Sequence, residues 1–158
     1  MIFADVNFIL SNNQTVNLKY DEKTPDIWIT TSNGKTKDSY KIEVIGAGSN
    51  IDSVSTDVIN GRNVLLAEIN LGESGGQINI DKRILYVFEF TKEGKIKLLV
   101  EEPIIDYCYE PYTEKASKFQ FYYYVYEAYS KEVIIYDSSN FMTMDEVKRI
   151  RLKELVKD

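Results

Sequence analysis

The sequence predicts a mainly β fold: an antiparallel sandwich, barrel or strongly bent sheet of about nine to eleven strands built from hairpins, with one C-terminal helix. Apolar residues recur mostly with a period of two, the spacing at which alternate side chains share one face of a strand. Val, Ile, Tyr, Phe and Thr, which favour strands, are abundant. The 158 residues, 44% of them hydrophobic, suffice for one core, so we expect a single domain over residues 1–158.

The first third of the chain is predicted to form two hairpins. Apolar and polar side chains alternate over residues 4–10 and again over 16–20, with the turn-forming segment SNNQ between them. Segments 27–31 and 40–45 flank Asn33-Gly34, a dipeptide that accepts the positive φ angles of a tight hairpin turn. Each pair of segments therefore predicts two adjacent antiparallel strands.

The middle of the chain contains the clearest local signal. Residues 63–70 (NVLLAEIN) are predicted to be a strand, and 72–77 (GESGGQ) a flexible loop because it holds three glycines. Residues 84–91 (ILYVFEFT) and 95–102 (KIKLLVEE) flank the turn sequence KEG. This pattern predicts a hairpin of two apolar strands.

The last third combines an aromatic hairpin with the only predicted helix. Segments 119–129 (FQFYYYVYEAY) and 132–137 (EVIIYD) predict the hairpin. Thr143 followed by Glu146 matches a capping box, which predicts an amphipathic helix over about 142–157. The apolar stripe of this helix is predicted to consist of Val147, Ile150, Leu152 and Leu155.

Composition excludes several classes of chemistry. The chain has no histidine and one cysteine, Cys108, so it has no Ser-His-Asp triad, no imidazole or thiolate zinc site and no internal disulfide. Lys+Arg 19 against Asp+Glu 25 gives a net charge of −6 without a basic run, which argues against a nucleic-acid partner. We expect neither a metal site nor a cofactor.

No apolar stretch approaches the length of a membrane span, and the opening segment MIFADVNFIL lacks the basic n-region of a signal peptide. These observations predict no membrane insertion and a cytoplasmic location. A trimmed extracellular domain of a Gram-positive surface protein is the alternative, because a single free cysteine fits both settings.

Tyrosine clustering is the strongest compositional anomaly. Nine of the twelve tyrosines lie between residues 107 and 136, and both faces of the 119–126 strand are aromatic. One face must belong to the core; the other is either covered or free to bind a partner, since tyrosine combines apolar area with a hydroxyl group. The candidate binding residues are Tyr107, Tyr109, Tyr112, Tyr122, Tyr124 and Tyr126.

Carboxylates are the remaining route to acid-base catalysis. Glu89 lies within an apolar strand, and Glu127 has the equivalent place in the aromatic hairpin, since residues 86–96 and 124–134 align without gaps. A pair of inward carboxylates would suit glycoside hydrolysis. We expect instead that both point to solvent, and we expect no catalytic residue.

The sequence therefore favours a non-enzymatic binding protein whose partner is another protein. The tyrosine-rich hairpin and an acidic surface that includes Glu101, Glu102 and Asp106 would engage it, as in inhibitors, immunity proteins or counter-defence proteins. A carboxylate-dependent hydrolase acting on a carbohydrate is one alternative. A structural piece of an envelope, a phage or a propeller assembly is another, because the spacing of the two aligned segments is close to that of propeller blades.

Overall fold

The computed structural model describes residues 5–11, 13–21, 23, 26–43, 49–75, 78–110, 115–139 and 144–157. These residues form two antiparallel sheets. The small sheet is a meander in the order β1-β2-β3-β4. Its strands are β1 (Asp5–Ile9), β2 (Thr15–Asp21), β3 (Asp26–Ser32) and β4 (Lys37–Glu43).

The large sheet has the order β12-β11-β10-β9-β8-β6-β5, and β7 pairs with the first residues of β8. Its strands are β5 (Asn50–Ile59), β6 (Arg62–Asn70), β7 (Glu73–Gly75), β8 (Ile78–Phe90), β9 (Ile96–Glu110), β10 (Lys115–Glu127), β11 (Glu132–Asp137) and β12 (Asp145–Arg151). One short helix, α1 (Leu152–Leu155), follows. Within the described residues, β5 and β12 are the two edges of the large sheet. The sheet is strongly bent, but in this part of the chain it is not closed into a barrel because these two edges do not pair with each other.

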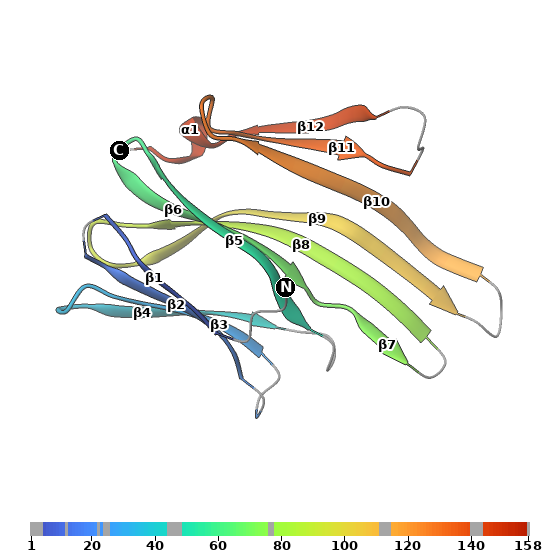
Figure 1. Cartoon of the computed structure of the whole chain (residues 1–158), viewed down its shortest axis with the longest axis horizontal. Helices are drawn as coiled ribbons and strands as arrows, with labels where there is room; N and C mark the ends of the chain where they lie inside the picture. The colour runs from blue at the N-terminus through green and yellow to red at the C-terminus, as the bar shows by residue number, and fades with distance from the viewer. Residues whose placement is uncertain are drawn as a thin grey trace.

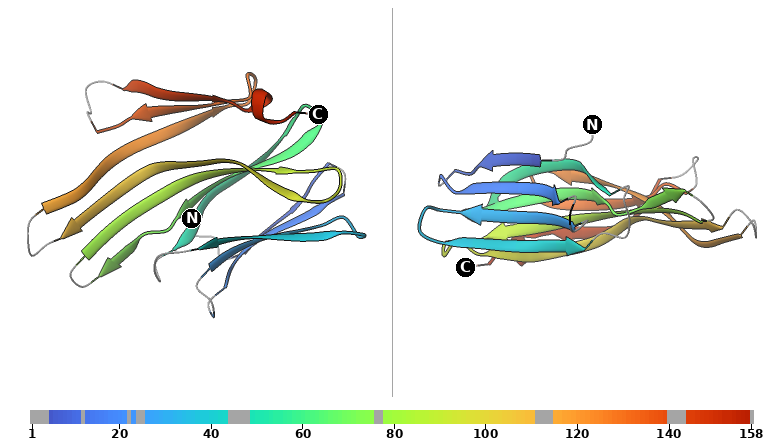
Figure 2. Two further views of the ribbon diagram at one scale, coloured as in Figure 1. Left: turned by 180° about the vertical axis from the view of Figure 1, so that it is seen from behind. Right: turned by 90° about the horizontal axis from the view of Figure 1, so that it is seen from below.

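Three layers result from this arrangement. Figure 1 shows the small sheet against one face of the large sheet, while β10, β11, β12 and α1 curl over the other face. The view from behind in Figure 2 shows the same order, with β5, β6, β8 and β9 between the two covering layers. The mainly β class predicted from the sequence is confirmed, in the form of two packed sheets of which the larger is bent.

The first core lies between the two sheets. Alternate residues of the small sheet, among them Leu18, Ile27 and Ile29, are fully buried against Leu65 and Phe88 of the large sheet. The period-two pattern predicted this, because side chains two residues apart share a face. The Tyr40 ring extends the core, with its centroid 5.1 Å from that of Phe88 in an edge-to-face arrangement.

The second core lies inside the curl of the large sheet. Val64 and Val87 of the central strands meet Val133 of β11 and Leu152 and Val156 near the C-terminus, and all five side chains are buried. Strands β6 and β8 are therefore buried on both faces. That explains why the NVLLAEIN and ILYVFEFT segments are nearly continuous apolar runs rather than alternating ones.

Two hairpin turns hold the sheets together at one end of the molecule. Gly94 in the β8–β9 turn has φ +81°, and a Cβ there would lie 2.3 Å from Thr36 Oγ1 in the β3–β4 turn. The Thr36 hydroxyl donates a hydrogen bond of 3.0 Å to the backbone carbonyl of Glu93. Glycine is thus required at position 94 both by its φ angle and by the close approach of the β3–β4 turn.

The predicted helix over 142–157 is wrong for most of its length. Asp145–Arg151 is the strand β12, which pairs with β11, and only Leu152–Leu155 is helical. The charged residues that suggested a helix form ion pairs with other strands instead: Arg149 with Glu132 of the neighbouring β11 at 3.0 Å, and Lys148 with Glu102 of β9 at 2.7 Å. Pairing with the edge of β11 gives β12 backbone hydrogen bonds along one side and packs Ile150 against the second core, which outweighs a local capping pattern. Thr143 lies outside the described residues.

The apolar stripe changes accordingly. Val147 and Leu155 are 48% and 38% exposed, Ile150 is half-buried, and the buried anchors are Leu152 and Val156. The backbone N–H of Leu152 donates to the Lys131 carbonyl, and Asn60 Nδ2 donates to the Val156 carbonyl at 2.7 Å. The C-terminal segment therefore closes the curl against the β10–β11 and β5–β6 turns.

We expect Leu152→Ala to lower the free energy of unfolding by about 2–5 kcal/mol, because it leaves a cavity in the second core. Leu155→Ala, one turn away and partly exposed, should cost less than about 1 kcal/mol. Urea denaturation of both variants checks this. Equal losses for the two residues would contradict the packing of the C-terminal segment described above.

Candidate functional site

Tyr122, Tyr124 and Tyr126 share one face of β10, as their spacing predicts, and this face points into the curl. All three are half-buried and pack against the second core. The Tyr124 hydroxyl lies 3.3 Å from Ser53 Oγ on β5, and the Tyr126 hydroxyl donates to Asp57 Oδ2 on the same strand. Tyr124 and Tyr126 therefore bridge the layer formed by β10, β11, β12 and α1, which we call the curled layer, to the edge strand β5.

The other candidate tyrosines lie elsewhere. Tyr107 and Tyr109 on β9 are half-buried and stacked with their ring centroids 6.4 Å apart, and Tyr107 also contacts Phe121. Tyr112 lies outside the described residues. On the outer face of β10, Tyr123 stacks on Tyr136 with a centroid distance of 5.1 Å. Both faces of β10 are thus aromatic, as the sequence indicates, but the candidates do not form one surface.

A groove opens beside the inward tyrosines where the curled layer faces β6. Its volume is about 350 Å³. Its lining, which we call the tyrosine groove, consists of Glu68, Ile104, Ile105, Tyr122, Tyr123 and Tyr124. Of the six candidate binding residues, the structure brings Tyr122 and Tyr124 together here.

Glu68, the carboxylate in the lining of the tyrosine groove, interacts with further charged residues nearby. Burial raises the pKa of Glu68, and the negative charge of Asp52 raises it further, although Arg83 and a hydrogen bond with Ser53 oppose the change. Burial likewise raises the pKa of Asp52, against the effect of Arg83. The Arg83 guanidinium is shared, because Nη1 lies 3.5 Å from Asp52 Oδ2 and Nε lies 3.2 Å from Asp81 Oδ1. These carboxylates are therefore incompletely neutralised.

Asp52 and Tyr124, which both interact with Glu68, show the effects of burial as well. Among the described residues, Asp52 Oδ2 is buried and has no hydrogen-bond partner. Burial raises the pKa of the Tyr124 hydroxyl, as does the Glu68 charge, while the bond with Ser53 lowers it. Two ionisable groups with shifted pKa values, Glu68 and Tyr124, thus line the groove, and a third, Asp52, lies close enough to Glu68 to raise its pKa, an arrangement typical of functional sites.

Asp57 forms a second polar link between β5 and the β10–β11 hairpin. Its Oδ2 accepts hydrogen bonds from Tyr126 and, at 2.7 Å, from Lys131 Nζ. Burial opposes ionisation, but the bonds from Lys131, Tyr126 and the Val58 backbone together hold the pKa of Asp57 below its usual value. This set of contacts closes the curl and is structural in character.

Glu89 and Glu127 are not a pair. Glu127 is exposed and accepts a hydrogen bond from Ser130, as expected of a solvent-facing residue. Glu89 is only 3% exposed, so the expectation that it points to solvent is wrong. It lies between Arg62 and Lys97, with shortest N–O distances of 3.7 and 3.9 Å, because the cross-strand neighbours on that face supply two cations.

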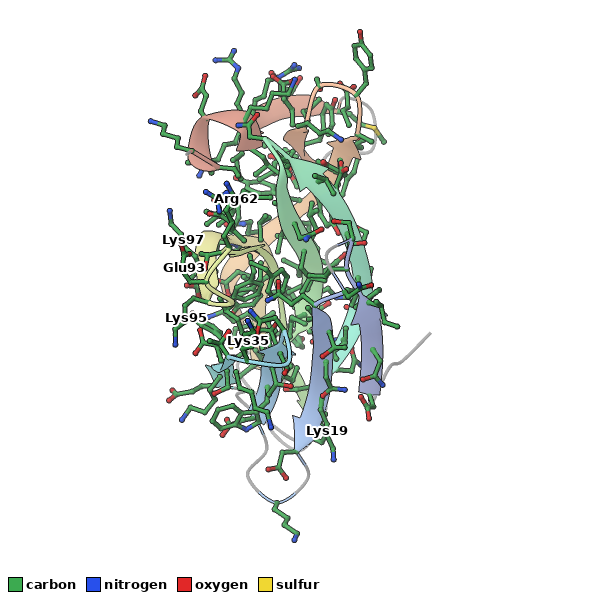
Figure 3. The ribbon with its side chains drawn as sticks, turned by 90° about the vertical axis from the view of Figure 1, so that its left-hand side faces the viewer. Lys19, Lys35, Arg62, Glu93, Lys95 and Lys97 are labelled. Atoms are coloured by element: carbon green, nitrogen blue, oxygen red, sulfur yellow. The ribbon has the colours of Figure 1, made fainter. Side chains whose placement is uncertain are left out.

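Several basic side chains gather at the end of the molecule where the turns meet. Figure 3 shows Arg62, Lys97, Lys95 and Lys35 one above another along this end, with Glu93 among them. The fold thus collects lysines that are scattered in the sequence. The predicted acidic surface is divided. Glu101 lies near the first core, where burial and then the Glu101 charge raise the pKa values of Tyr86 and Tyr40, whereas Glu102 pairs with Lys148 of the curled layer.

Within the described part of the chain, no group of three His, Cys, Asp or Glu side chains is arranged to hold a metal ion. The one turn of α1 is too short to cross a membrane, and no other described segment is helical. Comparison of the chain with family models, curated proteins and solved structures finds no match.

Glu68 and Asp52 are the site residues that sequence reasoning missed. Glu68 carries the same signal as Glu89, a single carboxylate within an apolar strand, NVLLAEIN. Asp52 had no such signal, because it does not lie in an apolar run and its ion-pair partner Arg83 is distant in sequence. The local sequence pattern therefore suffices to single out Glu68 as a candidate site residue, but not Asp52.

Asp57→Asn should lower the free energy of unfolding by about 1–3 kcal/mol at neutral pH, because it removes the charge that Lys131 and Tyr126 bind. A pKa lowered in the folded state contributes stability above the ordinary carboxyl pKa and loses it as the pH falls through the lowered value. Thermal unfolding of wild type and variant should therefore converge below about pH 4. A difference that stays constant with pH would contradict this role.

Glu68→Gln should raise the free energy of unfolding at neutral pH, whereas Asp57→Asn lowers it. A raised pKa means that the folded state favours the protonated carboxyl, so the ionised group costs stability at neutral pH. We expect the variant to gain up to about 1 kcal/mol at pH 7, with the gain shrinking as the pH falls and wild-type Glu68 becomes protonated. The exposed Glu154→Gln is the matched control. A loss of stability at pH 7 would show that the charge of Glu68 is compensated.

Proposed function

We propose that the protein is a non-enzymatic binding protein that engages another protein by taking a Lys or Arg side chain of that partner into the tyrosine groove. The observation that carries the proposal is the incomplete neutralisation of Glu68 and Asp52 beside an open groove. A cation from a partner would supply the missing charge. It would also lower the pKa values that burial has raised.

The remaining lining suits the rest of such a side chain. Ile104 and Ile105 offer apolar area for the aliphatic stem of a lysine or arginine. The Tyr122 and Tyr124 rings add the aromatic faces on which cations bind favourably. A buried cation of this kind at the centre of an interface is typical of residues that dominate binding energy.

Selection from a random-peptide display library tests the proposal directly. Peptides enriched on the wild-type protein should share a Lys or Arg at one position. They should bind Glu68→Gln at least about tenfold more weakly, since the variant keeps the shape but loses the charge. Glu43→Gln, whose side chain is 80% exposed on the small sheet, should bind like wild type.

Two results would reject the tyrosine groove as this site: enriched peptides without a basic position, or equal affinity of wild type and Glu68→Gln. Circular dichroism of the variant confirms that any loss arises in a folded protein.

The same carboxylates favour a second candidate function, hydrolysis of a carbohydrate. Half-buried carboxyl groups with raised pKa values are what general acid catalysis requires, and Glu68 and Asp52 meet that condition. Release of reducing ends from oligosaccharides, abolished in Glu68→Gln, would support hydrolysis and would contradict a purely binding role.

A further inference from the structure

The outer face of the small sheet, opposite the first core, carries a row of small polar side chains across all four strands. Cross-strand pairing aligns Asn7 with Asn17, Asn17 with Thr30 and Thr30 with Ser39. We call this row the polar trough. It is independent of the tyrosine groove, which lies in the large sheet.

Two further rows of side chains lie beside the polar trough on the same face. The neighbouring row on one side contains Lys19, Trp28 and Lys41, which are also aligned across the strands. The row on the other side contains Thr15, Ser32 and Lys37. The short side chains of the trough and of Thr15 and Ser32 leave a hollow of about 490 Å³. Its lining consists of the four trough residues together with Thr15, Val16, Thr31, Ser32, Lys37 and Asp38.

The trough runs perpendicular to the strands. Neighbouring strands lie about 4.8 Å apart, so four strands give the trough a length of about 14 Å. An elongated, shallow hollow of this length fits several consecutive units of a linear ligand better than it fits a single compact molecule.

The chemistry of the trough matches a ligand rich in hydroxyl groups. Amide and hydroxyl side chains both donate and accept hydrogen bonds, and each of the four trough residues is of one of these types. Asn17 Nδ2 donates to Asn7 Oδ1 at 2.8 Å and to Asp5 Oδ1, which fixes the orientation of its amide. A fixed amide costs less entropy when a ligand binds.

Trp28 adds an aromatic surface at the border. It is half-buried and lies two residues from Thr30 on the same face of β3. An indole ring offers a flat apolar area beside polar groups, the combination that binds the apolar face of a sugar ring. Trp28 is also the single tryptophan of the chain.

The charges around the trough are balanced. Lys41 Nζ lies 3.3 Å from Glu43 Oε1, Asp5 is paired across the strands with Lys19, and the hollow is lined by both Lys37 and Asp38. Such a surface attracts neither a polyanion nor a polycation strongly. We infer that the polar trough binds a neutral polysaccharide chain lying across the strands of the small sheet, with Trp28 stacked on one sugar ring.

Tryptophan fluorescence tests this inference, because every change in the signal reports on Trp28. The probes are the tetrasaccharides of cellulose, chitin, amylose and β-mannan, titrated to low millimolar concentration. We expect a saturable change with at least one of them. Asn17→Ala and Thr30→Val should each weaken that binding at least about tenfold, since each removes hydrogen-bonding groups from the trough.

Ser39→Phe, which fills the hollow, should abolish the response, and Thr56→Ala on the exposed side of β5 should leave it unchanged. Circular dichroism checks that each variant is folded. The inference is overturned if none of the four tetrasaccharides gives a saturable change, if the trough variants respond like wild type, or if heparin or an acidic peptide binds in their place. None of these outcomes bears on peptide binding at Glu68.

Discussion

The burial of β6 and β8 on both faces is the constraint on which the rest of the structure depends. Residues Val64 to Ala67 and Ile84 to Phe90 are buried without interruption. An antiparallel sheet commonly keeps one face in water, so two adjacent strands of this kind require a covering layer on each side. The small sheet supplies one layer. The other comes from the large sheet itself, which has to bend back over its own centre.

Irregularities in the long strands make that bend possible. The register between β8 and β9 shifts twice, between Arg83 and Ile84 and between Val87 and Phe88, and the β9–β10 and β11–β12 pairs each shift once. Bulges increase local twist and bend a strand without breaking its ladder. Side chains of the edge strand β5 then hold the curled layer in place. Asp57 accepts hydrogen bonds from Lys131 and Tyr126, and Ser53 is hydrogen-bonded to Tyr124. Polar contacts thus fix a geometry that apolar burial demands.

The distinction between local and non-local information explains what the sequence could predict. Hairpins at Asn33-Gly34 and around Gly94 follow from turn chemistry, and both glycines have positive φ in the structure. The shared face of Tyr122, Tyr124 and Tyr126 follows from the period of a strand. The inward orientation of this face cannot be predicted in the same way, because it results from the curl of the large sheet, which brings distant strands together. The helix prediction failed for the same reason: the free edge of β11, invisible in the local pattern, captures residues 145–151.

Two carboxylates on neighbouring strands, Glu89 buried and Glu68 half-buried, show how the same constraint separates structure from function. Glu68 on β6 and Glu89 on β8 both point away from the first core, Glu68 opposite Leu85 and Glu89 opposite Val64. Glu89 has two cations within 4 Å, Arg62 and Lys97, although among the described residues its Oε2 has no hydrogen-bond partner. Glu68 depends on an arginine already shared with Asp52 and Asp81, beside a groove that the covering layer leaves open. A buried charge without full compensation destabilises the free protein, and a partner that delivers the missing cation relieves that cost only when bound. This difference in compensation, rather than burial itself, makes Glu68 the residue on which a binding function would depend.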